Sequence, residues 1–454
     1  MVLTVCKYNS YGQIEDKELK FVLLESLKWL EQNQEKETVG DSIFAGEWPS
    51  TMGLKNSYIL LGSSFDYRDS NCFTQANIFN TLAEMYLSDS TLSDVPKMLR
   101  RATPEILSYR DSLTFNFWKK LPPNIPLSRK GPHPPGYLAH RPTNFGLKTR
   151  FINNAADIAN DADDTSTGSL SLFYRAKILG DSSNIPSQKV FDSYIDGSRP
   201  NYHWYNFIHK IPRPSGAYMT WLSDEYEFKH WSFPWQVAHN LVFFLPGSSC
   251  FPHPYKRYIP WGANDVDAIV NCNVINYLGK TDQLENSAGK EGAIRLLKHV
   301  IKKERWSRAG IYYPNRYFLH YSFSKIYPFL EDSLVDEAKS LVSHLVTSQN
   351  ADGSFHSRNK ANRKDPLQST VYAFLAMINF KVAGMDIPKS AIDKALNYIL
   401  FEAIHDSQGI HWKGGVFFSG GTIVRNVLFF KSDAYTTAIM AQGIQKYIQE
   451  YQRD

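Results

Sequence analysis

Six apolar segments, each opened by a helix-start signal, constrain the fold of this chain more than any other feature. Each begins with an acid, an asparagine or a proline and continues with small and apolar residues. An Asp or Asn side chain caps the free N–H groups of a first helical turn, and proline fits that turn. A helix that is apolar on most faces is buried on all sides. The sequence therefore predicts six buried helices, in segments 68–87, 158–179, 262–279, 312–330, 364–383 and 431–449.

Helices with one charged face alternate with these six segments. They are predicted at 16–34, 289–304, 330–349 and 389–404. Alternation of buried and amphipathic helices is typical of stacked helical hairpins. We therefore predict an all-α fold, with one domain spanning 1–454. It is an (α/α)6 toroid in which outer amphipathic helices surround six inner apolar helices.

Two regions interrupt the helical pattern. The segment 414–430 contains short strand signals separated by glycines, and it predicts a small hairpin. The connection at about 180–260 is long for a compact domain, so we expect a lid-like insertion there or an unrecognised helix pair.

Composition excludes several classes of protein. The net charge of +5 is spread over 454 residues without a long Lys/Arg block, so no nucleic-acid partner is expected. We find neither a signal peptide nor an apolar run of the roughly 18 residues that cross a membrane. The four cysteines lack CxxC spacing, so neither a zinc site nor a disulfide framework is predicted. These features predict a cytoplasmic protein without metal or other cofactor.

The segment "IANDADDTST" (158–167) places Asp161, Asp163 and Asp164 at the start of a predicted buried helix. Parallel inner helices bring their N-termini to one end of a toroid, where the helix dipoles tolerate carboxylates. One acid is enough to cap a helix. If Asp161 is the cap, Asp163 and Asp164 are not needed for capping. A carboxyl group that is desolvated and flanked by like charges has a raised pKa and can deliver a proton. The alternative is an exposed acidic turn without a role.

Two short motifs carry a family resemblance. "DADDTS" (161–166) resembles the DxDDTA-type motif of class II terpene cyclases, the squalene–hopene cyclase superfamily. "QNADGSF" (349–355) is similar to the core of the Gln–Trp repeats in that family, with Phe355 in place of Trp. The family is built from α/α toroids, usually two of them, whereas this chain contains about one.

The resemblance implies a protonation-initiated cyclase. Asp163 would protonate an alkene or epoxide of a linear isoprenoid, and Asp161 and Asp164 would tune Asp163. The 28 Phe, 26 Tyr and 10 Trp suit a cavity whose ring faces stabilise carbocations. No DDxxD-type magnesium motif is present, so no metal is implied. The expected partner is an apolar isoprenoid, with peripheral membrane contact as a route for its uptake.

A second acidic motif, "GANDVDAIVN" (262–271), supports a different class of enzyme. In (α/α)6 glycoside hydrolases, lyases and epimerases, two carboxylates face each other across a groove. Asp265 and Asp267 would supply the second cluster opposite Asp163 in such a carbohydrate-active enzyme. In a cyclase, Asp265 would be chiefly a helix cap and Asp267 would line the cavity rim. A binding scaffold without catalysis is the third alternative.

Aromatic and basic residues near these motifs are candidates for binding the substrate. The stretch 201–221 is rich in aromatic residues and predicts a lid or groove loop, and 251–262 brings basic residues near Asp265. Together with Asp265 and Asp267, the predicted substrate-binding residues are Tyr202, Trp204, Tyr218, Arg257 and Trp261. A loop that only packs over the toroid is the alternative for 201–221.

Overall fold

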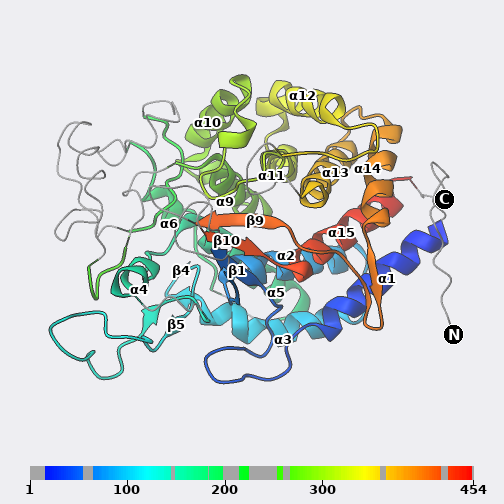
Figure 1. The fold of residues 1–454 in the computed structure, drawn as a ribbon. Helices are drawn as coiled ribbons and strands as arrows, with labels where there is room; N and C mark the ends of the chain where they lie inside the picture. Colours follow the sequence, from blue (N-terminus) through cyan, green and yellow to red (C-terminus); the bar gives the residue numbers. More distant parts are fainter. Residues whose placement is uncertain are drawn as a thin grey trace.

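Six inner helices form a closed ring at the centre of the molecule. The computed structural model describes residues 16–54, 65–144, 149–181, 184–197, 214–223, 253–258, 266–357, 365–420 and 428–451. Each inner helix packs against the next, and the last packs against the first (Figure 1). They are α2 (Cys72–Ser88), α5 (Ala162–Leu179), α9 (Ala268–Lys280), α11 (Phe318–Ile326), α13 (Pro366–Val382) and α15 (Asp433–Tyr451). All six correspond to the predicted buried segments.

Amphipathic helices surround this ring. They are α1 (Asp16–Gln32), α3 (Val95–Ser108), α10 (Lys290–Lys302), α12 (Glu331–Ser348) and α14 (Lys389–Phe401). Each buries one apolar face, as α14 does with Ile392, Ala395, Leu396 and Ile399. Burying one apolar stripe against the ring removes it from water, and this removal stabilises the outer layer. The predicted toroid is confirmed, with α3 as an additional outer helix.

Four of the six inner helices have an Asp or Asn side chain as their cap, all at one common end. Asn71, Asp161, Asp267 and Asp365 each accept a backbone N–H from the first turn of the helix that follows. A cap of this kind satisfies donors that have no partner within the helix. Because the inner helices run parallel, the polar caps gather at the same end of the ring.

An antiparallel sheet crosses this capped end. Its strands are β1 (Thr51–Leu54), β2 (Phe65–Arg68), β9 (Val416–Gly420) and β10 (Leu428–Lys431), in the order β2-β1-β10-β9. In the view of Figure 1, β9 and β10 pass in front of α2. The predicted hairpin at 414–430 is confirmed by the β9–β10 pair, whereas β1 and β2 were not predicted. The Ser419 N–H of β9 donates to the Tyr312 carbonyl ahead of α11, at 2.8 Å, which fixes the sheet to the ring.

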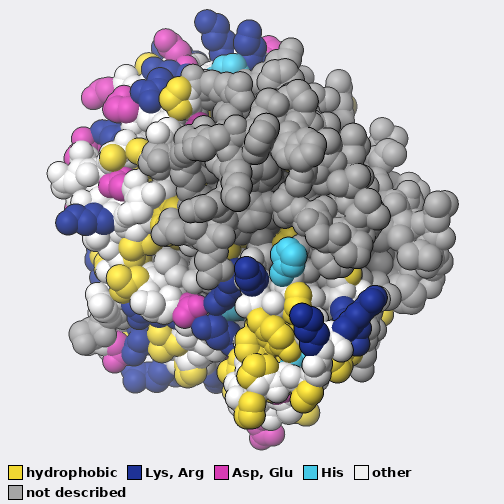
Figure 2. All heavy atoms as spheres, turned by 90° about the vertical axis from the view of Figure 1, so that its left-hand side faces the viewer, with side chains coloured by type: hydrophobic (Ala, Val, Ile, Leu, Met, Phe, Trp, Pro, Cys, Tyr) yellow, Lys and Arg dark blue, Asp and Glu magenta, His cyan; other side chains and the backbone are white. Residues whose placement is uncertain are grey.

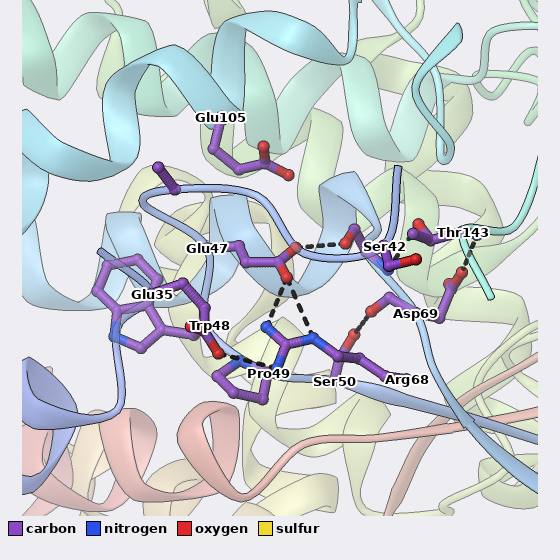
Figure 3. A network of polar contacts seen from close by, with 12 residues as sticks. Glu35, Ser42, Glu47, Trp48, Pro49, Ser50, Arg68, Asp69, Glu105 and Thr143 are labelled. Carbon is purple, nitrogen blue, oxygen red and sulfur yellow. Dashed lines mark hydrogen bonds and ion pairs between the residues drawn. The ribbon is translucent and has the colours of Figure 1, made fainter. Parts of the chain in front are cut away.

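A buried polar network anchors the sheet to the start of α2. The Arg68 guanidinium pairs with Glu47 at 2.6 Å and with Glu35 at 2.8 Å, and Figure 3 shows it pointing at the Glu47 carboxylate. Asp69 accepts the Thr143 N–H and the Trp118 indole N–H, each at 3.0 Å. These contacts hold the residues immediately before α2 in place.

The "QNADGSF" turn joins outer helix α12 to inner helix α13, as the resemblance implied. The Gln349 amide donates to the Ala391 carbonyl at 2.9 Å and to the Gly353 carbonyl at 3.2 Å. A Cβ atom on Gly353, whose φ is +87°, would lie 2.2 Å from the Lys394 carbonyl oxygen, so glycine is required there. Phe355 is fully buried at the end of the turn.

Short elements connect these layers. They are β3 (Arg110–Asp111), β4 (Thr114–Phe115), β5 (Lys120–Leu121), β6 (Ala139–His140), β7 (Ile404–Asp406), β8 (Gly409–His411), α4 (Arg150–Ala156), α6 (Lys189–Asp192) and three 3-10 turns at Leu284–Asn286, Trp306–Arg308 and Tyr327–Phe329. The predicted insertion at about 180–260 lies largely outside the described residues and remains a prediction.

Charges are mixed on the outside of the molecule. Figure 2 shows Lys and Arg side chains interspersed with acidic and neutral ones over the described part of one face. Within the ranges that the structure describes, no helix is both long enough and apolar enough to cross a membrane.

Candidate active site

Three carboxylic acids are buried in the first turn of α5. Asp161 is the N-cap, and its Oδ1 accepts the Asp164 N–H at 2.7 Å. Asp161, Asp163 and Asp164 are only 5%, 4% and 2% exposed. The alternative of an exposed acidic turn is therefore wrong. Burying three acids costs free energy unless protons or hydrogen bonds compensate for the lost solvation.

Asp163 is held by one donor from α9 and one from the segment before α11. The Asn273 side-chain amide of α9 donates to Asp163 Oδ1 at 2.6 Å. The Tyr313 hydroxyl, from the segment before α11, donates to Asp163 Oδ2. Both carboxyl oxygens therefore have fixed positions. Because the two donors are neutral, they orient the group without neutralising a charge on it.

Burial and neighbouring charge keep protons on this cluster. Desolvation raises the pKa of Asp163 to about 7, the charge of Asp161 adds to the rise, and the hydrogen bonds from Tyr313 and Asn273 oppose it. Burial also raises the pKa of Asp161 to about 6. Burial and the charges of Asp161 and Asp163 raise the pKa of Asp164 well above its ordinary value. At neutral pH the site therefore contains carboxyl protons available for transfer.

Asp164 has a different environment from Asp163. Its Oδ1 is buried without a hydrogen-bond partner among the described residues. The Cys72 thiol lies beside it, and burial together with the charge of Asp164 raises the pKa of this thiol well above its usual range. A protonated Asp164 avoids an uncompensated buried charge, so this residue stores a proton next to Asp163.

Aromatic rings pack around Tyr313, whose hydroxyl donates to Asp163. The Tyr313 ring lies 4.4 Å from Phe318, 5.6 Å from Phe418 and 5.8 Å from Phe73, measured between centroids. These rings come from α2, α11 and β9. Further buried rings on the inner helices and the sheet are Tyr321, Tyr372, Phe417, Phe430 and Tyr435. Ring faces attract cations, so this environment favours positive charge near a group that donates protons.

Asp267, the described acid of the second motif, has a structural role. The Asp267 carboxylate is fully buried and accepts four backbone N–H groups. The donors are Ile269, Val270, Ile311 and Tyr312. Asp267 therefore caps α9 and also holds the backbone directly before Tyr313. The expectation that Asp267 lines a cavity rim is corrected, because both oxygens are occupied by the backbone.

Two of the other predicted binding residues, Tyr218 and Arg257, have partners other than the three acids. The Tyr218 hydroxyl is 2.6 Å from Ser287 Oγ beside α10, and the Arg257 guanidinium pairs with Asp111 at 3.0 Å. Among the described residues, neither side chain forms a hydrogen bond or ion pair with Asp161, Asp163 or Asp164. Tyr202, Trp204, Trp261 and Asp265 lie outside the described residues, so their roles remain predictions.

Asn273 and Tyr313 were not predicted from the sequence. Asn271, Asn273 and Asn276 are polar residues in an otherwise apolar segment, and this pattern was an available signal for Asn273. Tyr313 is one aromatic residue among many, so only the structure distinguishes it. Within the described ranges, no group of three or more His, Cys, Asp or Glu side chains is arranged to hold a metal ion.

Comparison with known proteins adds to this geometry. The sequence matches no protein-family model and no curated protein. A variant of type II terpene cyclase MstE from Scytonema, in complex with its product merosterolic acid A, aligns with a TM-score of 0.53 at 11% identity. That alignment covers 96% of this chain and 98% of the other. The chain has the fold of a type II terpene cyclase.

Two more structures extend the comparison. Another MstE variant, in complex with its substrate geranylgeranyl dihydroxybenzoate, aligns with a TM-score of 0.51 at 12% identity, covering 96% and 99% of the two chains. A protein described as a possible member of the GH105 family, from Salmonella enterica subsp. enterica serovar Paratyphi A, aligns with a TM-score of 0.47 at 12% identity, covering 99% and 100%. The expected resemblance to class II terpene cyclases is confirmed at the level of the fold.

Proposed function

We propose that this protein is a class II terpene cyclase that acts on a linear isoprenoid, with Asp163 as the general acid. The observation that supports this most directly is the environment of Asp163. The group is buried, has a pKa of about 7, and lies among aromatic rings with both oxygens held by neutral donors. The shared fold with MstE, whose described ligands are an isoprenoid-bearing substrate and its product, supports the same assignment.

In the proposed reaction, the Asp163 proton moves to a carbon of a terminal alkene or to an epoxide oxygen. The alkene π electrons form the new C–H bond and leave a cation on the more substituted carbon. Internal alkenes then attack this cation and close rings, and loss of a proton ends the reaction. The Tyr313 and Asn273 donors stabilise the Asp163 carboxylate that is left, because both hydrogen-bond to its oxygens.

Asp161 and Asp164 tune the acidity of Asp163. A negative charge on Asp161 disfavours ionisation of Asp163. Asp164, whose pKa is raised well above its ordinary value, stays protonated beside it. The rings of Phe73, Phe318 and Phe418 face the same region as Tyr313 and would stabilise the cation by cation–π attraction, worth about 1–2 kcal/mol for each well-placed ring.

The carbohydrate-active alternative requires a second carboxylate available opposite Asp163. In the described part of the second motif, Asp267 accepts four backbone N–H groups and has no oxygen left for a sugar or a water. This arrangement favours the cyclase over a two-carboxylate hydrolase.

Turnover in deuterated water tests the proposal. The protein is incubated with linear isoprenoids, with and without an epoxide or diphosphate, and the products are analysed by mass spectrometry. From an alkene, a cyclase that donates its own exchangeable proton yields a cyclic product with a new C–D bond. From an epoxide the deuteron goes to oxygen, so the cyclic product itself is the readout. Asp163→Asn yields neither product. Hydrolysis of an oligosaccharide panel without any isoprenoid turnover would contradict the proposal.

A further inference from the structure

The end of the ring opposite Asp163 is lined by polar side chains, one or more from every inner helix. On α5, Tyr174 follows Asp163 by 11 residues, which corresponds to about 16 Å along the helix axis. The side chains at this end are Glu84 of α2, Tyr174 of α5, Lys280 of α9, Lys325 of α11, Asn379 of α13, and Gln442 and Lys446 of α15.

These side chains form one connected cluster around Glu84. The Tyr174 hydroxyl and the Gln442 amide donate to its two oxygens, at 2.8 and 2.9 Å. The Lys280 ammonium lies 3.6 Å from Glu84 Oε1, and the nearby charges of Lys280, Lys325 and Lys446 lower the pKa of Glu84 to about 2 against the effect of its burial. One carboxylate therefore faces three ammonium groups.

Most of the ammonium donors in this cluster have no acceptor among the described residues. Each ammonium group offers three N–H donors. Among the described residues, the Lys446 ammonium donates to Asn379 Oδ1 at 2.7 Å, while no hydrogen bond or ion pair holds Lys325. Burial lowers the pKa of Lys325, and burial lowers that of Lys446 to about 8, with Lys280 and Lys325 adding repulsion. The cluster therefore has excess positive charge and free donors.

Helix dipoles do not account for the whole arrangement. Lys280 and Lys325 lie in the last turns of α9 and α11, where a positive charge offsets the partial negative charge of a helix end. Lys446 lies five residues before the end of α15 and is outside the range of that effect. Glu84 lies near the C-terminal end of α2, where the helix dipole favours a positive charge and disfavours the negative charge of a carboxylate. The convergence of these groups needs another explanation.

We propose that this cluster, which we call the lysine mouth, binds a phosphate or diphosphate group. The lysine mouth comprises Glu84, Lys280, Lys325 and Lys446. Three ammonium groups approaching from three helices match an anion with several oxygens, and lysine binds phosphate as a compact point charge. The Glu84 and Lys280 side chains are 20% and 38% exposed, so a solute reaches the cluster from outside the ring.

Calorimetry with inorganic pyrophosphate tests this site without depending on the proposed cyclase activity. The wild-type protein should bind pyrophosphate, and Lys325→Met and Lys446→Met should each weaken binding about tenfold or more, the size of one charged hydrogen bond. Lys298→Met, which removes an exposed lysine of α10, should bind like the wild type. Equal affinity in the Lys446→Met and Lys298→Met variants, or no binding to the wild type, would overturn the proposal.

Glu84→Gln provides a test in the opposite direction. It removes the one carboxylate of the lysine mouth while keeping its size, so pyrophosphate should bind more tightly than to the wild type. This result does not require a lysine variant to fold. Unchanged or weaker binding in folded Glu84→Gln would contradict the site.

Turnover experiments distinguish the two sources of such an anion. If the phosphate belongs to an isoprenoid diphosphate substrate, which rests on the proposed function, pyrophosphate competes with it and Lys446→Met raises KM. If the phosphate belongs to a separate ligand, pyrophosphate binds but does not compete. Pyrophosphate binding in a protein without cyclase activity would leave the site intact and refute only the proposed function.

Discussion

The two Asn-Asp-x-Asp motifs of this protein have nearly the same sequence and different roles. In the first motif, Asp161 is the helix cap, and Asp163 is two residues inside the helix. In the second, the cap is Asp267, and α9 starts only after the motif ends. The register of the helix start differs by two residues between the motifs. This shift decides whether the last carboxylate is a structural cap or is available for chemistry.

The backbone explains the difference. Asp267 accepts four N–H groups, so its negative charge is well compensated despite complete burial. The Asp163 carboxyl accepts hydrogen bonds only from side chains among the described residues, those of Asn273 and Tyr313. A buried acid with fewer donors keeps its proton to a higher pH. The motif alone therefore does not distinguish a structural cap from a candidate general acid, whereas the motif and its cap position together do.

The largest expected effect is loss of turnover in Asp163→Asn. The substitution is nearly isosteric and removes the transferable proton, so the rate should fall by about 10²–10⁴-fold or more. Product formation on an isoprenoid panel measures this, with a melting curve as the control for folding. Residual activity within about tenfold of the wild type, ~1.4 kcal/mol of barrier, would show that Asp163 is not the acid.

Asp267→Asn should instead affect stability. An amide offers one acceptor oxygen where the carboxylate has two, so backbone N–H groups of the α9 cap or of Ile311 and Tyr312 lose a buried partner. We expect a loss of about 2 kcal/mol in the free energy of unfolding. Activity should remain within about tenfold in the folded protein. A stable Asp267→Asn protein with activity as low as that of Asp163→Asn would support the two-carboxylate enzyme.

The two motifs should also differ in how stability depends on pH. The pKa of Asp163 is raised to about 7 in the folded state, so the folded protein holds a proton that the unfolded chain releases near pH 4. The stability contributed by this group is complete below about pH 4 and is lost as pH rises through about 7. Asp163→Asn should therefore be more stable than the wild type at pH 8, and the difference should shrink at pH 5. Denaturant titrations at both pH values measure this, and an equal difference at both would contradict it.

Tyr313→Phe should produce a smaller, diagnostic effect. It removes a hydrogen bond that favours the ionised form of Asp163, so the pKa of Asp163 should rise further. The alkaline limb of the pH–rate profile should move to higher pH, with a rate loss of about tenfold or less. Phe318→Leu, which changes a neighbouring ring without touching the carboxyl, serves as the control. An unchanged pH profile in Tyr313→Phe would show that the Tyr313 hydrogen bond does not affect the pKa of Asp163.

The smallest expected effect is that of chelation. Catalysis by protonation needs no metal, so exhaustive treatment with EDTA should leave turnover unchanged. Loss of activity that a divalent ion restores would assign the carboxylates of α5 to a metal site instead of to proton transfer.

The ring of inner helices could be predicted well because the sequence of an inner helix contains two independent signals of a helix. Apolar periodicity and a capping residue coincide at α2, α5, α9 and α13, and both signals are local. The acids of α5 were identified for the same reason. Asn273 and Tyr313 were not, because their importance arises from the packing of α9 beside α5 and from the contact of the segment before α11 with Asp163, and no local pattern encodes these contacts. β1 and β2 were missed because short strands depend on a distant partner, here β10.

The sheet also has a consequence for how the protein forms in the cell. β1 pairs with β10, and α1 packs against α15. The N-terminal elements β1 and α1 are synthesised first, so they cannot form these contacts until the C-terminal elements have been synthesised. Until β9 and β10 leave the ribosome, the capped end of the ring lacks its cover, and the aromatic residues around Asp163 are exposed to water and to chaperones. Contacts between such distant segments slow folding, which makes the nascent chain vulnerable to proteases. The three acids at the start of α5 would thus be sheltered from water only when the ring closes.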